Sequence, residues 1–402
     1  MIPRITGQDP DDRSANVIRI VGGRVWSESG FSSVELTITG EQIVAVNKIP
    51  CQRSDTVLDA TGCFVVPGFI DLHVHGGDGV DFLEASEESI SRIATFQASH
   101  GTTQTLASLA PADAGLLRRA IERLAEHPRP GVLGVHLEGP FVSPHQKGAL
   151  NATHILPPNV ETFSELVSGC EHAIRVVTLA PELPGSPELV AEVRRIGAMP
   201  AVGHSQATYR ETVAAFRHGA GLITHLFNAM RGMHHREPGV VGAALLDPLV
   251  CLELIADGVH VHPSILRFVI ETLKGQESLH RLCLISDSTS AAGCPDGTYE
   301  LGGQPIAVID GVARLESGEL AGSTLTLDQA LRNIIFYSNL PLEEAVRLVS
   351  ANPATVLGRE DLGTLRPGSQ ADVVVLDKDL GVQTTIRAGR IVYDKGNDRL
   401  ER

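Results

Sequence analysis

The chain has 402 residues, and its 33 Lys and Arg against 48 Asp and Glu give a formal net charge of −15 at pH 7. So acidic a protein repels polyphosphate unless its basic residues cluster. The sequence has no run of Lys or Arg, and nucleic acid and anionic membranes are therefore disfavoured as partners. No apolar stretch approaches the roughly 20 residues that span a bilayer, and six scattered cysteines without C-x-x-C spacing suit a cytoplasmic protein with reduced thiols.

Both ends of the chain show the pattern of short β-strands. Residues 17–66 contain brief apolar runs separated by Gly, Asp and Asn turn signals, without a helical pattern between them. The tail from about residue 360 has the same character. We therefore predict a small β-sandwich domain that is built jointly from residues 1–66 and 360–402.

Between the two ends, over residues 67–359, apolar runs alternate with amphipathic helical stretches. The eight runs are "FVVPGFIDLHVH", "TTQTLASLA", "GVLGVHLEG", "IRVVTLAPE", "MPAVGHS", "GLITHLFN", "VCLELIADG" and "RLCLISDS". The expected helices span 84–100, 113–127, 186–197, 207–219, 263–274, 324–338 and 341–350. Eight β–α alternations predict an α/β fold, a parallel (β/α)₈ TIM barrel, and residues 296–320 a hairpin-like insertion.

In such a barrel the active site lies at the C-terminal ends of the strands. These run ends carry many side chains of metal-ligand type: His73 and His75 on the first run, His136 and Glu138 on the third, His204 on the fifth, His225 on the sixth, Asp257 and then His260 on the seventh, and Asp287 on the eighth. Because residues two apart on a strand face the same way, His73 and His75 can reach one divalent cation.

The remaining strand-end residues can complete one metal site or two adjacent ones. Glu138 is a natural bridging carboxylate between them. Histidine and carboxylate ligands without thiolate suit Zn²⁺ first, and also accept Fe²⁺, Mn²⁺ or Co²⁺. Taken alone, each residue has a structural reading: His204 as an ordinary satisfied histidine, Asp287 as a helix N-cap. Their coincidence at five strand ends favours the metal site.

Six segments of the barrel resemble the amidohydrolase superfamily, and within it the N-acetylglucosamine-6-phosphate deacetylases. The matching segments are 67–76, 134–149, 202–207, 224–242, 255–261 and 284–293. "HLEGPF", "THLFNAM" and "DGVH" are the specific elements, and the closing "LGTLRPGSQADVVVLD" resembles the return to the small β-domain. The resemblance implies a metal-dependent hydrolase that converts N-acetylglucosamine 6-phosphate to glucosamine 6-phosphate and acetate in amino-sugar catabolism.

The resemblance also implies roles for individual residues. Glu138, His204 and His225 match the principal metal ligands, and His73 and His75 match members that hold a second ion, so one or two ions are expected. Asp287 matches the catalytic acid and base. Asn228, the Ala229 backbone, Arg236 and His260 match positions that grip the sugar phosphate, the arginine from the partner subunit of a homodimer.

One position departs from the resemblance. Many relatives carry a histidine near the substrate where this chain has Leu150, in "KGALN". Leucine cannot donate a hydrogen bond, so the contact is absent or comes from His145 or Asn151. A deacetylase of another N-acetyl-hexosamine phosphate or N-acyl compound, and a non-catalytic sugar-phosphate-binding homologue, therefore stay open as alternatives.

Overall fold

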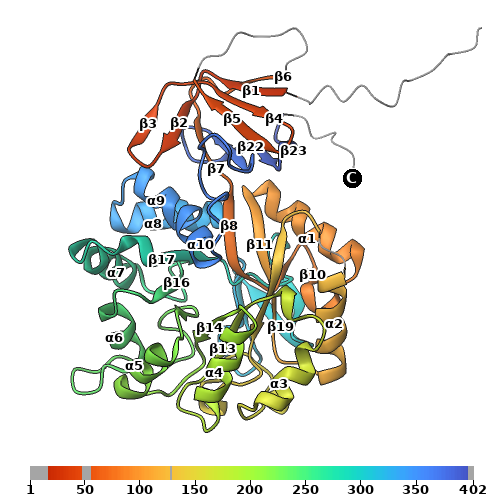
Figure 1. Cartoon of the computed structure of the whole chain (residues 1–402), viewed down its shortest axis with the longest axis vertical. Coiled ribbons are helices and arrows are strands. Elements are labelled where there is room, and N and C mark those ends of the chain that lie inside the picture. Colours follow the sequence, from red (N-terminus) through yellow and green to blue (C-terminus); the bar gives the residue numbers. More distant parts are fainter. Residues whose placement is uncertain (1–16, 48–55, 127–128, 397–402) are drawn as a thin grey trace, which may run out of the picture.

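A computed structural model describes residues 17–47, 56–126 and 129–396 of the chain (Figure 1). Eight parallel strands follow one another in chain order around a barrel. They are β8 (Phe69–Val74), β11 (Thr102–Leu109), β12 (Val132–Glu138), β13 (Ile174–Leu179), β14 (Met199–Val202), β15 (Leu222–Ile223), β16 (Cys251–Ile255) and β17 (Leu282–Ile285). Their apolar runs are almost wholly buried, as expected for strands covered on both faces.

The barrel closes between its first and last strands. The backbone N–H of Asp287 donates to the carbonyl of His73 at 2.9 Å, and that of His75 donates to Ser288 at 2.8 Å. The closing hydrogen bonds therefore lie at the strand ends that carry the predicted ligands. The predicted (β/α)₈ barrel is confirmed.

Helices surround the barrel (Figure 1). They are α1 (Glu87–Ser99), α2 (Ala114–Glu126), α3 (Val160–Val167), α4 (Ser186–Arg195), α5 (Tyr209–His218), α6 (Gly239–Leu246), α7 (Pro263–Gly275), α8 (Leu327–Ser338), α9 (Leu342–Leu348) and α10 (Ala351–Val356). All seven predicted helices occur. In α5 the signals that mark a helix in a sequence are present at both ends: Thr208 and Glu211 form a capping box at its start, and Gly219 ends it at φ 112°.

Three helices were not predicted, namely α3, α6 and α10. The reason is clearest for α6, whose sequence GVVGAALL is apolar on every side. Because a helix buried all round has no polar face, it lacks the amphipathic period by which helices are found in a sequence.

Strands from both chain ends share one sheet, in the order β23-β22-β21-β7-β2-β3. A second sheet, β5-β4-β1-β6, lies beside it (Figure 1). The strands are β1 (Val17–Val21), β2 (Arg24–Ser27), β3 (Gly30–Ser32), β4 (Leu36–Thr39), β5 (Gln42–Val46), β6 (Thr56–Asp59), β7 (Phe64–Pro67), β21 (Val373–Leu376), β22 (Val382–Arg387) and β23 (Arg390–Asp394). The boundaries 1–66 and 360–402 stay a prediction, and residues 1–16, 48–55 and 397–402 lie outside the described part.

The first predicted barrel run is split between two sheets at Gly68. Its first half, β7, pairs with β2 and β21, whereas β8 enters the barrel one residue later. A Cβ atom at Gly68 would lie 2.2 Å from the Thr103 hydroxyl oxygen, so only glycine fits this junction. The Thr103 side chain therefore packs directly against the backbone at the point where the small sheet joins the barrel.

The predicted insertion after the eighth strand is a three-stranded antiparallel sheet of β18 (Gly297–Leu301), β19 (Gln304–Ile309) and β20 (Val312–Arg314). A short pair, β9 (Gly76–Gly77) and β10 (Val80–Asp81), follows β8. Within the described residues no helix is long and apolar enough to cross a membrane. The five cysteines found there are free thiols, and Cys51 lies outside the described residues.

Candidate metal centre and active site

Three of the predicted site residues lie where the backbone turns sharply at a strand end. His204, His225 and Asp287 follow β14, β15 and β17 with φ of 46°, 31° and 51°. This left-handed conformation is costly for residues other than glycine, and it persists where the surrounding structure holds it. Such strain gathers at functional sites.

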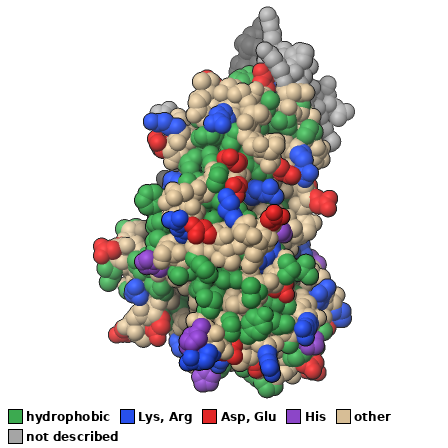
Figure 2. All heavy atoms as spheres, turned by 90° about the vertical axis from the view of Figure 1, so that its left-hand side faces the viewer, with side chains coloured by type: hydrophobic (Ala, Val, Ile, Leu, Met, Phe, Trp, Pro, Cys, Tyr) green, Lys and Arg blue, Asp and Glu red, His purple; other side chains and the backbone are tan. Residues whose placement is uncertain are grey.

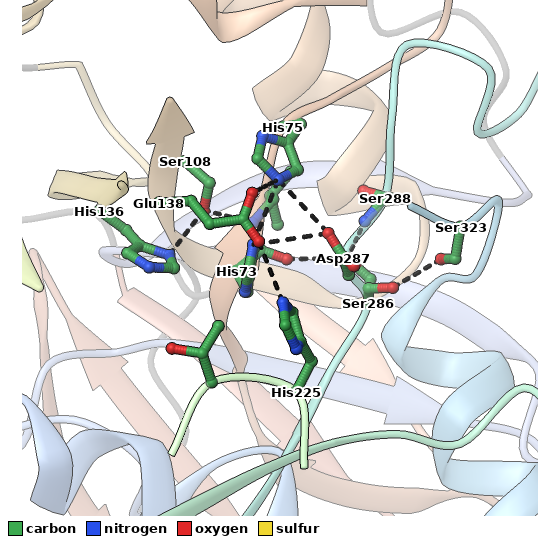
Figure 3. Close-up of polar contacts among 12 residues, drawn as sticks. His73, His75, Ser108, His136, Glu138, His225, Ser286, Asp287, Ser288 and Ser323 are labelled. Atoms are coloured by element: carbon green, nitrogen blue, oxygen red, sulfur yellow. Dashed lines mark hydrogen bonds and ion pairs between the residues drawn. The ribbon is translucent and has the colours of Figure 1, made fainter. Parts of the chain in front are cut away.

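A first group consists of His73, His75 and Asp287, all buried (Figure 3). The Nε2 atoms of the two imidazoles lie 3.2 Å apart. Asp287 Oδ1 lies 3.4 Å from each of these nitrogens. Three possible ligand atoms thus face one another across a space that is large enough for a single ion.

A second group consists of Glu138, His204 and His225, and it is buried as well. Glu138 Oε1 lies 3.0 Å from Nε2 of each of the two imidazoles, which are themselves 3.1 Å apart. The same carboxylate reaches the first group, with 3.3 Å between Oε2 and His75 Nε2. Glu138 therefore stands between the two groups, as its predicted bridging role requires.

The geometry of both groups fits a divalent cation. Two imidazole nitrogens bound tetrahedrally to one ion at zinc-like bond lengths lie about 3.3 Å apart, close to the separations of 3.2 and 3.1 Å found here. Without an ion, unprotonated ring nitrogens at this distance would direct lone pairs at each other. The donor set of histidine and carboxylate suits a divalent metal.

The electrostatics of the first group point the same way. Burial alone lowers the pKa of His73, but the carboxylates of Asp287, Glu138 and Glu253 outweigh it and raise the pKa to about 9. The pKa of His75 is likewise raised well above its usual value, against burial, by Asp287 and Glu138. The site therefore attracts positive charge, which either protons or a metal cation can provide.

Polar partners behind the groups orient the imidazoles. His204 Nδ1 donates to the carbonyl of Gln146 at 2.9 Å. His136, which the sequence analysis placed among the strand-end residues, belongs to neither group: its ring nitrogens lie 3.0 Å from Ser108 Oγ and 2.8 Å from Thr178 Oγ1. Its ring packs edge-on against His73, and burial together with His73 lowers the pKa of His136 well below its usual value.

Two buried acids at the site, Asp71 and Glu253, were not predicted from the sequence. Asp71 Oδ1 accepts hydrogen bonds from the backbone N–H groups of His73 and Ser286, and burial raises the pKa of Asp71 to about 7. Glu253 Oε2 lies 3.3 Å from His73 Nδ1. Both acids sit inside apolar strand runs, and a carboxylate in a wholly buried strand was the available signal.

A cavity of about 290 Å³ opens above the two groups. Of the predicted substrate contacts, Asn228, Ala229 and His260 line it, and Arg236 does not. Arg236 is exposed, and its guanidinium lies 2.8 Å from the ring of His235. His260 Nδ1 lies 2.5 Å from Asp257 Oδ2; this contact outweighs burial and raises the pKa of His260.

One wall of the cavity is apolar. Leu150 lines it together with Leu301 and Leu320. Neither predicted substitute for the missing histidine reaches it: His145 is exposed, and Asn151 caps a short helical turn by accepting from Thr153 N–H. The contact of the missing histidine is therefore absent among the described lining residues.

Fold and site together define the class: the chain belongs to the amidohydrolase family, whose sequence model matches residues 64–392. Within that family it is similar to the deacetylases of amino-sugar 6-phosphates. The N-acetylgalactosamine-6-phosphate deacetylase of Escherichia coli O157:H7 is 38% identical over 90% of this chain and 95% of that protein. The N-acetylglucosamine-6-phosphate deacetylase of Vibrio furnissii is 35% identical over 94% of both chains.

A solved structure extends the similarity to three dimensions. A mutant N-acetyl-D-glucosamine-6-phosphate deacetylase of Mycobacterium smegmatis, in complex with N-acetyl-D-glucosamine 6-phosphate, superimposes with a TM-score of 0.87. It is 37% identical and covers 94% of this chain and 99% of its own.

Proposed function

We propose that the chain is a metal-dependent hydrolase that removes acetate from N-acetylglucosamine 6-phosphate. The observation that carries the proposal is the pair of buried His/carboxylate groups, joined through Glu138, beneath a 290 Å³ cavity. The similarity to amino-sugar-6-phosphate deacetylases over nearly the whole chain supports the substrate class.

The metal ligands in this proposal come from five strands of the barrel. Glu138, His204 and His225 hold one ion, and His73 and His75, with Asp287 beside them, hold a second. Zn²⁺ fits the donor set best, and Fe²⁺, Mn²⁺ and Co²⁺ are acceptable. A bound cation supplies Lewis acidity, which lowers the pKa of water and polarises the acetyl carbonyl.

Asp287 moves the proton in this scheme. Burial raises its pKa, but the imidazoles of His73 and His75 outweigh burial and lower it, so the side chain is a carboxylate at neutral pH. It takes a proton from the attacking water as the water oxygen bonds to the acetyl carbon. When the carbon–nitrogen bond breaks, Asp287 returns the proton to the amine, and acetate is released.

The phosphate needs donors at the cavity rim. His260, held by Asp257 through Nδ1, donates from its other nitrogen, and Asn228 offers an amide. Arg236 lies too far out on its loop to line the cavity of its own chain, and we propose that it serves the site of a partner subunit in a homodimer.

An apolar surface supports the homodimer. Figure 2 shows apolar side chains gathered on the side of the molecule that carries α6 and α7. At the end of α6, just after it and within α7, the side chains of Leu246, Leu249 and Phe268 are 65%, 85% and 42% exposed. Patches of this kind mark protein interfaces, and Arg236 lies just before α6. The free thiols support the proposed cytoplasmic location.

The galacto epimer is the second candidate substrate. It is favoured by the E. coli relative and by Leu150 on the cavity wall. Acetate release from N-acetylglucosamine 6-phosphate and N-acetylgalactosamine 6-phosphate, measured side by side, decides between them. We expect a higher kcat/KM for the gluco substrate; equal or reversed preference overturns this choice.

A further inference from the structure

Glu253 is a buried acid that the proposed chemistry does not use. It lies in the middle of β16 with no solvent exposure, and Oε1 has no hydrogen-bond partner among the described residues. A buried carboxylate with an unpaired oxygen destabilises the fold unless it serves another purpose. The contacts of its other oxygen indicate that purpose.

Glu253 Oε2 contacts one residue of each metal group: the backbone of His225 and the ring of His73. It accepts a hydrogen bond from the backbone N–H of His225 at 3.3 Å, so this oxygen acts as an acceptor. His73 Nδ1 lies 3.3 Å from the same oxygen, and because a carboxylate oxygen only accepts, Nδ1–H is the donor in this pair. With its proton fixed on Nδ1, a neutral His73 presents the lone pair of Nε2 toward His75 and Asp287.

Each metal group contains one imidazole that is held through its Nδ1 atom and one whose Nδ1 has no partner among the described residues. In the second group, His204 is fixed by the carbonyl of Gln146. Nδ1 of His225 in the second group and Nδ1 of His75 in the first have no partner among the described residues. In the first group the contact of His73 with Glu253 is therefore the orienting bond. Glu253 is thus the described residue that holds an imidazole of the first group through Nδ1.

We propose that Glu253 is a positioning residue that sets the tautomer of His73 and thereby the metal affinity of the His73–His75–Asp287 group. This inference rests on the metal binding that the proposed function requires. It makes the second ion separable from the first: disturbing Glu253 weakens one ion and leaves the ion at Glu138, His204 and His225 in place.

The test titrates metal-stripped protein with Zn²⁺ against a chromophoric chelator. We expect two equivalents for the unmodified chain, whereas Glu253→Gln keeps one at full affinity and binds the other about 10- to 100-fold more weakly. The matched control is Glu182→Gln, because Glu182 supports the turn after His204 through Ser205 and Gln206 rather than through an imidazole. The control should bind both ions normally.

Thermal unfolding without metal shows whether each variant folds. Should Glu253→Gln fail to fold, Glu253→Asp is the second variant, since it keeps the charge but withdraws the carboxylate from His73 by one methylene; the same selective loss is expected. Unchanged affinity for both ions, equal weakening of both, or fewer than two equivalents for the unmodified chain would overturn the proposal. Failure of the unmodified, metal-loaded chain to release acetate would instead count against the proposed function alone.

Discussion

The site is organised around one side chain. Glu138, at the end of β12, lies within 3.5 Å of an Nε2 atom of each of His73, His75, His204 and His225. Oε2 faces His75 of the first group, whereas Oε1 faces both imidazoles of the second group and His73 of the first. A single carboxylate placed in this way can bridge two cations, which explains how ligands from five strands act as one centre.

Asp287→Asn tests the proton transfer. The amide keeps the shape of the side chain but cannot accept and return a proton, so we expect kcat for acetate release to fall by about 10²- to 10⁴-fold. KM for the sugar phosphate should change little. Kinetics on both proteins, with metal content measured in parallel, check this.

A variant that retained kcat within tenfold would contradict the acid–base role of Asp287. Loss of metal from the Glu138 group would point to a structural cause instead. An unmodified chain that binds the sugar phosphate without turnover would favour the non-catalytic alternative.

Residue identity could be predicted where a side chain stands at a strand end. His73 and His75 were found through the period of two along a strand. Glu253 was missed because it sits in the body of β16, where a single acid among apolar neighbours gives no spacing pattern. The position of Arg236 outside the cavity depends on the path of a loop, which local sequence does not determine.

At the scale of elements, one carboxylate links α1 to α8. Asp328, in the first turn of α8, accepts from His100 Nδ1 at 3.1 Å and from Arg332 at 2.8 Å. Burial raises the pKa of Asp328, but His100, Arg332 and Thr326 outweigh it and lower the pKa to about 2. A carboxylate with a lowered pKa stabilises the fold above its unfolded pKa, and this stability is lost as the pH falls from about 4 to about 2.

Asp328→Asn should therefore lower the free energy of unfolding by about 2 kcal/mol at pH 7. The difference from the unmodified chain should shrink by roughly half at pH 3. Urea unfolding at both pH values measures it, with Asp379→Asn as the control because Asp379 is exposed. A loss no larger than that of the control at pH 7 would refute this account of Asp328.

Helices and strands with a regular hydrophobic period were predictable from the sequence. A uniformly apolar helix and the junction between two sheets were not. The amphipathic helices appear with ends close to those expected, since caps such as the box at Thr208 mark them. The uniformly apolar α6 and the split of one apolar run at Gly68 went unnoticed. In both cases tertiary contacts, rather than local pattern, decide the structure: burial on all sides for α6 and the approach of Thr103 for Gly68.

At the scale of the whole molecule, the barrel was predictable from the count of β–α alternations, and the joint sheet from the strand pattern that both chain ends share. The assembly did not, because nothing in the sequence shows which exposed side chains meet another subunit. The position of Arg236 outside its own cavity makes the proposed dimer testable by complementation.

Arg236→Ala should raise KM about 10- to 100-fold through the lost charged hydrogen bond to phosphate. Asp287→Asn should be inactive. When the two variants are coexpressed, mixed dimers contain one site with an intact Asp287 and an intact partner arginine. Activity at low substrate should then reach about a quarter of the normal value. Activity no higher than the average of the two variants alone would exclude a shared site.

Elemental analysis of the purified chain beside Glu138→Gln tests the central claim most directly, because the Glu138 carboxylate lies within 3.3 Å of His75 Nε2 in the first group and 3.0 Å of His204 Nε2 in the second. We expect one or two equivalents of a divalent transition metal in the unmodified chain and a marked loss in the variant. An unmodified chain that releases acetate with no bound metal, or a variant that keeps its full metal content, would contradict a cation held between these strand ends.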